Sequence, residues 1–139
     1  MSKDIEFKIV IPSKAMPAVK VAQVSIPAFK GMMTIIPDRA PTTVLLTTGI
    51  LEILDENSEA VKKYFIQGGV ANIAANECVV MTERAFAFDD ISEEKLQELR
   101  EEHLNELNEV QASIPTQKID FDDSEMKFYD YISHYLKKK

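Results

Sequence analysis

Apolar and polar residues alternate one by one near the start of the chain. In the segment Ile5–Ile11, whose sequence is IEFKIVI, large apolar residues occupy every second position. Because successive side chains of a β-strand point to opposite faces, this pattern predicts a strand with one face on an apolar core.

Further short apolar segments follow, and turn-forming residues separate nearly all of them. Examples of such turns are Asp55–Ser58, Gly68-Gly69 and Ala75-Asn76. Many short strands joined by tight turns predict an antiparallel β-sandwich or flattened barrel. The expected strands are Val19–Ile26, Met32–Ile36, Thr43–Leu46, Ile50–Leu54, Val61–Gln67, Val70–Ala74, Glu77–Thr82 and Ala85–Phe88.

From Asp89 onward the apolar spacing becomes that of a helix. Asp90 and Ser92 are candidate N-caps, and Glu93 and Glu94 follow where the helix dipole favours acids. One narrow apolar stripe is expected along this helix, and it includes a histidine. Its members are Leu96, Leu99, His103, Leu107, Val110 and Ile114.

Pro115 should end the first helix, and Asp122, Asp123 or Ser124 should cap a second one that reaches Leu136. The fold class is therefore α+β: an antiparallel β-sandwich over residues 1–89, then an αα-hairpin over residues 90–139. Apolar residues cover about half of the second helix, more than one seam needs. We expect this hairpin to dock on the sandwich or on a partner and to be releasable.

Composition narrows the range of functions. The net charge of −7 and pI near 4.9 argue against nucleic acid or anionic lipid as the main partner and favour a protein partner. No apolar run approaches the roughly 20 residues that span a bilayer, and the first residues resemble neither a signal nor a transit peptide.

Candidate catalytic and metal-binding residues are few. Cys78 stands in an alternating strand and reads as a structural thiol, and the acids of the first helix read as its water-facing side. His103 lies on the apolar stripe, where it is either a seam residue or a pH-sensitive contact, and His134 lies on a polar side. There is no G-x-S-x-G motif, and Gly68-Gly69 lacks the Lys of a phosphate-binding loop.

The segment from Ala22 to Leu51 combines apolar strands with fixed Pro and Gly positions. It resembles the epsilon subunit of F-type ATP synthases, whose pattern V-x-x-V-x-x-P-x-x-x-G-x-x-G-I-L-P-x-H-A-P is followed by L-x-x-G. A second block, Phe65–Ala85, resembles the Gly-Gly hairpin and last strands of that family. Thr34 replaces a usual Gly, and Arg39 a usual His. The residues in register are Val21, Val24, Pro27, Gly31, Ile35, Ile36, Pro37, Ala40, Pro41, Leu46 and Gly49.

The resemblance implies a non-catalytic rotor subunit that binds the gamma subunit and the c-ring and couples proton-driven rotation to ATP synthesis. It implies a peripheral position on the cytoplasmic face of a bacterial inner membrane. The family's ring-facing loop corresponds to Gly31 through Pro41. The expected partner contacts are Gly31, Met32, Met33, Asp38, Arg39, Phe128, Tyr131 and Tyr135.

The resemblance also implies a helical hairpin that can contact the catalytic alpha and beta subunits and inhibit ATP hydrolysis, and that binds ATP in some relatives. The family's nucleotide motif, I/L-D-x-x-R-A, aligns with Ile91, Ser92, Lys95 and Leu96, and Glu102 stands where an Arg is usual. We therefore expect weak or absent ATP binding and no metal or cofactor. The alternatives are a free-standing sandwich adaptor with an interaction hairpin and, more distantly, a small isomerase.

Overall fold

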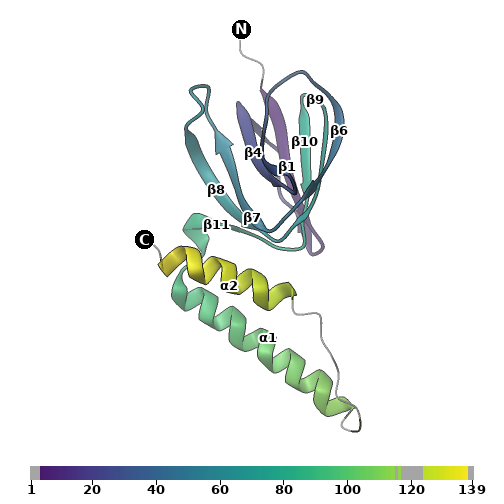
Figure 1. Ribbon diagram of the computed structural model, residues 1–139, viewed down its shortest axis with the longest axis vertical. Helices are drawn as coiled ribbons and strands as arrows, with labels where there is room; N and C mark the ends of the chain where they lie inside the picture. The colour runs from purple at the N-terminus through teal and green to yellow at the C-terminus, as the bar shows by residue number, and fades with distance from the viewer. Residues whose placement is uncertain (1–3, 115, 117–123, 138–139) are drawn as a thin grey trace. The chain divides into compact units, whose positions relative to one another are not determined.

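The computed structural model describes residues 4–114, 116 and 124–137, apart from the side chain of Arg39. The chain divides into two compact units, Met1–Phe88 and Asp89–Lys139. The boundary expected from the sequence lies one residue later. The first unit is a β-sandwich and the second contains two helices (Figure 1), so the predicted order of fold elements is confirmed.

The sandwich is built from short strands. They are β1 (Ile5–Ile11), β2 (Lys14–Ala15), β3 (Val19–Val21), β4 (Gln23–Ala28), β5 (Gly31–Ile35), β6 (Arg39–Leu46), β7 (Gly49–Leu54), β8 (Ala60–Ile66), β9 (Gly69–Ala75), β10 (Glu77–Met81) and β11 (Ala85–Ala87). A 3₁₀ turn, Phe88–Asp90, follows the last strand.

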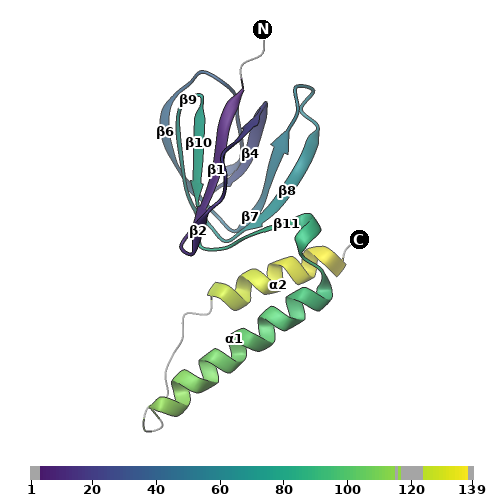
Figure 2. The same cartoon turned by 180° about the vertical axis from the view of Figure 1, so that it is seen from behind.

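All strands belong to one curled sheet, in which β11, β8, β7, β4, β6, β9, β10, β1 and β2 are successive neighbours. In addition, β3 pairs with β1 and β5 pairs with β4. The β1–β10 pair is parallel, whereas the other pairs are antiparallel. Figure 2 shows β1 beside β10, far from it in sequence.

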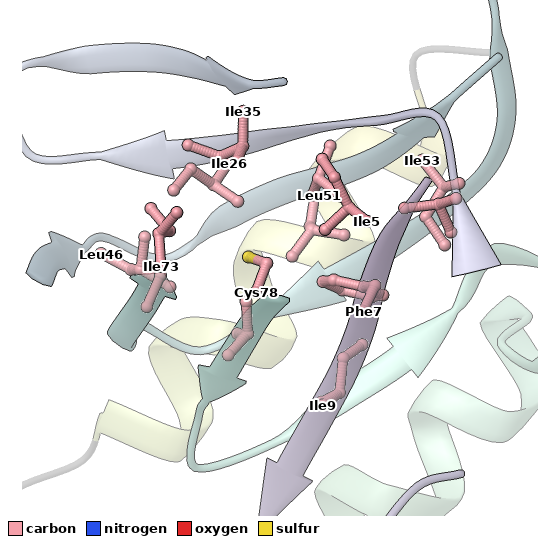
Figure 3. Close-up of a cluster of buried hydrophobic side chains, with 14 of the residues drawn as sticks. Ile5, Phe7, Ile9, Ile26, Ile35, Leu46, Leu51, Ile53, Ile73 and Cys78 are labelled. Carbon is pink, nitrogen blue, oxygen red and sulfur yellow. The ribbon is translucent and has the colours of Figure 1, made fainter. Parts of the chain in front are cut away.

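The curled sheet closes around an apolar core (Figure 3). Ile5, Phe7 and Ile9 point into it from β1, and Leu51 and Ile53 enter it from β7. Cys78 of β10 is fully buried among them. Ile5, Phe7 and Ile9 are thus buried and Ile11 is partly buried, as the alternation along β1 predicts.

Several sequence-based strand assignments are wrong in detail. The expected strand Val19–Ile26 is divided at Ala22 into β3 and β4, because its two parts pair with different neighbours. The strand β3 pairs with β1, whereas β4 pairs with β5 and β7. The two-residue strand β2 was not expected. The stretch Gly31–Pro41 is not one loop, since β5 and the start of β6 lie within it.

The second unit contains α1 (Glu93–Ser113) and α2 (Ser124–Lys137). Ser92 is the N-cap of α1, as expected, and its side chain accepts a hydrogen bond from the Lys95 amide. The predicted stop at Pro115 and caps at Asp122 and Asp123 lie outside the described residues. The helices contact each other within this unit.

The apolar stripe of α1 is buried only in its first half. Leu96 and His103 are buried, but Val110 and Ile114 are 47% and 43% exposed. The expectation that this stripe is buried along its whole length is therefore wrong. The reason is length: α2 has 14 residues, about 21 Å of helix, whereas α1 has 21 residues, about 31 Å.

Cys78 should be chemically inert in the folded chain. Burial raises the pKa of its thiol to about 11, so very little reactive thiolate exists at neutral pH. We expect Ellman's reagent at pH 8 to react at least about 100-fold more slowly with native protein than with protein in urea. Between about pH 9 and pH 11 the thiol keeps its proton in the folded chain but loses it in the unfolded chain. The free energy of unfolding therefore falls as pH rises through this range. Equal rates in the two solutions would contradict the burial.

Gly69 and Gly31 offer a matched test of backbone packing. Both have φ near +120°, but a Cβ at Gly69 would lie 2.0 Å from the Met81 carbonyl oxygen, whereas at Gly31 it meets nothing within 4 Å. Gly31→Ala should cost about 1–3 kcal/mol in the free energy of unfolding, from backbone strain alone. Gly69→Ala should cost at least about 2 kcal/mol more, because backbone must move. Urea denaturation measures the difference, and equal losses would rule out the close contact.

Candidate partner-binding surface

An apolar row runs across the outer face of the sandwich. In the ladders Leu45 of β6 is opposite Val70 of β9, Val70 is opposite Met81 of β10, and Met81 is opposite Val10 of β1. Ladder partners share a face of the sheet. The residue next to each of them in its strand is buried, namely Leu46, Ala71, Val80 and Ile9. The side chains of Leu45, Val70, Met81 and Val10 therefore point outward.

Phe29 extends this row beyond Leu45. Its amide donates a hydrogen bond to the Leu45 carbonyl at 3.2 Å, which places the end of β4 directly beside β6. Phe29 is 70% exposed, Leu45 59% and Met81 39%. We call Phe29, Leu45, Val70, Met81 and Val10 the outer apolar row. Exposure of several large apolar side chains in register is typical of a surface that binds another protein.

Polar groups border the outer apolar row. Two residues before Leu45, on the same face of β6, the Thr43 hydroxyl donates a hydrogen bond to the Asn72 side chain at 3.0 Å. At the other border a shallow pocket of about 390 Å³ lies beside Val10 and Met81 and is also lined by Gln67, Thr82 and Glu83. An apolar centre with a polar rim is the usual anatomy of a protein interface.

The sequence predicted contacts at the turn between β4 and β5, and the structure divides them. Met32 is 57% exposed beside Gly31, whereas Met33 is partly buried and packs against the core. Met33 is opposite Ile26, a core residue, and this explains its inward direction. A contact with a partner is therefore better provided by Met32 than by Met33.

Asp38 and Arg39 lie beyond the other end of β5. The Asp38 amide donates a hydrogen bond to the Asn76 side chain at 3.0 Å, and Arg39 is opposite Ala75 in the ladder. Asp38 has a φ of 63° and is exposed. The structure thus does not bring Asp38 and Arg39 together with Gly31 and Met32.

The three aromatic candidates of α2 have different environments. Phe128 is 1% exposed, which argues against a contact with a separate partner in this conformation, and the partner contact expected there stays a prediction. Tyr131 is 38% exposed and Tyr135 is partly buried. Burial raises the pKa of the Tyr131 hydroxyl, and the nearby Tyr135 raises it further, so Tyr131 stays neutral at physiological pH.

The residues aligned with a nucleotide motif serve structural tasks. Ile91 and Leu96 are buried, at 6% and 3% exposure. The Ser92 hydroxyl is used as the helix cap, and Glu102 is exposed. These positions offer phosphate no cation apart from Lys95.

Two polar contacts join α1 to α2. Arg100 forms an ion pair with Asp130, and the Nδ1 atom of His103 lies 3.4 Å from an oxygen of Glu125. The Tyr129 hydroxyl donates a hydrogen bond to the other Glu125 oxygen at 2.7 Å. His103 was predicted to lie on the seam, and its burial confirms this.

No cluster of three or more potential metal ligands occurs within residues 4–114, 116 and 124–137. Among the described helices, none is long and apolar enough to cross a membrane. The features that distinguish the described surface are exposed apolar residues, and sequence reasoning missed Phe29, Leu45 and Met81. The signal for Leu45 and Met81 was available, because each stands at an outward position of an alternating strand.

Comparisons with known proteins agree on one family. Residues 4–88 match the family model described as ATP synthase, Delta/Epsilon chain, beta-sandwich domain. The ATP synthase epsilon chain of Ruegeria sp. is 34% identical over 102 residues, which cover 73% of this chain and 73% of the relative. The mitochondrial ATP synthase subunit delta of Schizosaccharomyces pombe is 37% identical over 91 residues, covering 65% of this chain and 54% of that protein.

Two solved structures share the fold. A chain of the Euglena gracilis mitochondrial ATP synthase, solved with OSCP, F1 and c-ring, has a TM-score of 0.62 and 21% identity, covering 96% of this chain and 81% of its own. A chain from the central stalk and c-ring of the Tetrahymena thermophila enzyme has a TM-score of 0.52 and 13% identity, covering 99% and 96%. These two structures show the shared fold, and the matched family model together with the relatives above shows that this chain belongs to the delta/epsilon chain family of ATP synthases.

Proposed function

We propose that this chain is a non-catalytic rotor subunit that joins the gamma subunit to the c-ring and transmits torque between them. Membership of the family and association with the ATP synthase complex are the basis of the proposal. The observation that carries it is the outer apolar row, which gives the sandwich an exposed apolar contact surface.

Burial of the outer apolar row would supply the binding energy. Complete burial of one Leu, Met or Phe side chain contributes about 1.5–3 kcal/mol. Phe29, Leu45 and Met81 together therefore offer several kcal/mol before the entropic cost of association. We propose that gamma covers this row, and that Met32 at the β4–β5 turn contacts the ring or the foot of the stalk.

A peripheral position follows from this assignment. A subunit that contacts both gamma and the ring lies next to the membrane without entering it, and in a bacterium this is the cytoplasmic face of the inner membrane. The inhibitory role of the helices, and their contacts with the alpha and beta subunits, stay predictions from the family resemblance.

Charge substitutions on the surface test the proposal. In Leu45→Glu, Met81→Glu and Met32→Glu a carboxylate replaces an exposed apolar side chain, so folding should be kept while burial against a partner becomes costly. We expect Leu45→Glu and Met81→Glu to weaken capture of gamma at least about tenfold, and Met32→Glu to weaken capture of the c-ring. Pull-down of both partners by the tagged full-length chain measures this.

Val61→Glu is the matched control. Val61 is 64% exposed and apolar, but it lies on β8, away from the outer apolar row in the strand order. It should capture gamma and the ring as well as the unmodified chain does. If all four variants bind normally, or if Val61→Glu is as damaging as Leu45→Glu, the assignment of the surface is wrong.

A further inference from the structure

The strand β5 forms an open edge of the sandwich. Among the described strands it pairs with β4 alone, in a ladder that places Ile35 opposite Val24 and Gly31 opposite Ala28. Gly31, Met32 and Thr34 are exposed. An edge strand presents backbone N–H and C=O groups with which a strand of another chain can pair.

The position of Pro27 in β4 shows which backbone groups of β5 point outward. Proline has no N–H, and the Pro27 carbonyl accepts a hydrogen bond from the Thr47 amide at 2.8 Å. Thr47 follows β6, which pairs with β4 on the side opposite β5. Antiparallel residues alternate between pairs that exchange hydrogen bonds and pairs whose groups point away from each other. Because Met32 is opposite Pro27, the backbone groups of Met32, and of Thr34 two residues later, point away from β4.

No charged side chain protects this edge, since the sequence of β5 is GMMTI. The edge strands β2 and β3 carry Lys14 and Lys20, and β11 has only three residues. Lysines and short strands are usual means by which a sheet edge avoids pairing with other chains. The edge of β5 has five residues and no lysine, so it is suited to pairing.

We propose that β5 accepts an extended segment of the gamma subunit as an additional strand. This inference rests on the proposed function, in which gamma covers the outer apolar row. Phe29 of that row lies three residues before Met32, which corresponds to at most about 10 Å of chain. A partner that covers Phe29 therefore reaches the edge of β5 as well. The Met32 side chain projects from the face of the sheet and stays available for the contact already assigned to it.

The open edge also defines the chemistry of the added strand. Its hydrogen bonds to Met32 and Thr34 would supply affinity, and the side chains beside these residues would determine preference. Met32 is apolar and 57% exposed, and Thr34 is uncharged. A charged residue placed opposite them would lose hydration without gaining an ion pair. The segment should therefore be uncharged and rich in β-branched residues.

A second copy of this chain is a less suitable occupant of the edge. Each copy has a net charge of −7, so two copies repel each other. An edge of five residues is also small beside the roughly 20–30 residues that each partner contributes to a stable interface. Gamma would add the outer apolar row to this contact, whereas a second copy paired along β5 would gain the edge alone.

Residue-resolved hydrogen exchange on the full-length chain tests the added strand. In the free chain the amides of Met32 and Thr34 should exchange at least about tenfold faster than those of Met33 and Ile35, which point toward β4. Gamma should slow the Met32 and Thr34 amides at least about tenfold, whereas the c-ring alone should leave them fast. Slow exchange of these two amides in the dilute free chain, with the ring alone, or only as the concentration of the chain itself rises would overturn the proposal.

Two substitutions of Thr34 form a matched pair. Thr34→Pro removes an outward N–H at a position where an edge strand tolerates proline, whereas Thr34→Val keeps the N–H. We expect Thr34→Pro to weaken capture of gamma at least about tenfold and Thr34→Val to capture it as the unmodified chain does. Slow exchange at Met33 and Ile35 in both variants shows that the β4–β5 pair is intact.

The same measurements separate this inference from the proposed function. If gamma is captured and Leu45→Glu weakens the capture, but the Met32 and Thr34 amides stay fast, strand addition is wrong and the rotor assignment stands. If the unmodified chain captures neither gamma nor the ring, the rotor assignment fails and the inference falls with it.

Discussion

The register of the sandwich strands determines both the core and the surface of this protein. Side chains alternate between the two faces of a strand, so a one-residue slip would exchange all buried and exposed positions. Burial of Ile9, Val80, Ala71 and Leu46 on the inner face therefore fixes the direction of the residue next to each. The outer apolar row is a consequence of this strand register.

The close approach of strands at Gly69 supports the same register. A side chain there would collide with the backbone at Met81. Only glycine therefore allows the start of β9 to lie this close to the end of β10. Gly69 is opposite Leu46 on its other side. Local backbone chemistry and burial of the core thus point to the same alignment of β6, β9 and β10.

The sequence predicts those features that depend on neighbouring residues. Alternation in Ile5–Ile11, the turn at Gly68-Gly69 and the cap at Ser92 are local, and the structure confirms them. The parallel pairing of β1 with β10 depends on residues about 70 positions apart, and no local pattern encodes it.

The candidate surface was predictable only in part for the same reason. Met32 could be found from its place beside Gly31. Leu45 and Met81 are single outward residues in separate strands, and they become one row only through the pairing of β6, β9 and β10. Phe29 lies in no predicted strand, and its position depends on a hydrogen bond to a residue of β6.

In the helical unit, polar contacts fix the register of the two helices, which apolar packing alone would leave ambiguous. Leu, Ile and Tyr side chains can pack acceptably after a shift of one helical turn, whereas an ion pair cannot. Arg100 and His103 follow each other on α1, and their partners Asp130 and Glu125 follow in the reverse order on α2. Both pairs can form at once only in one antiparallel register.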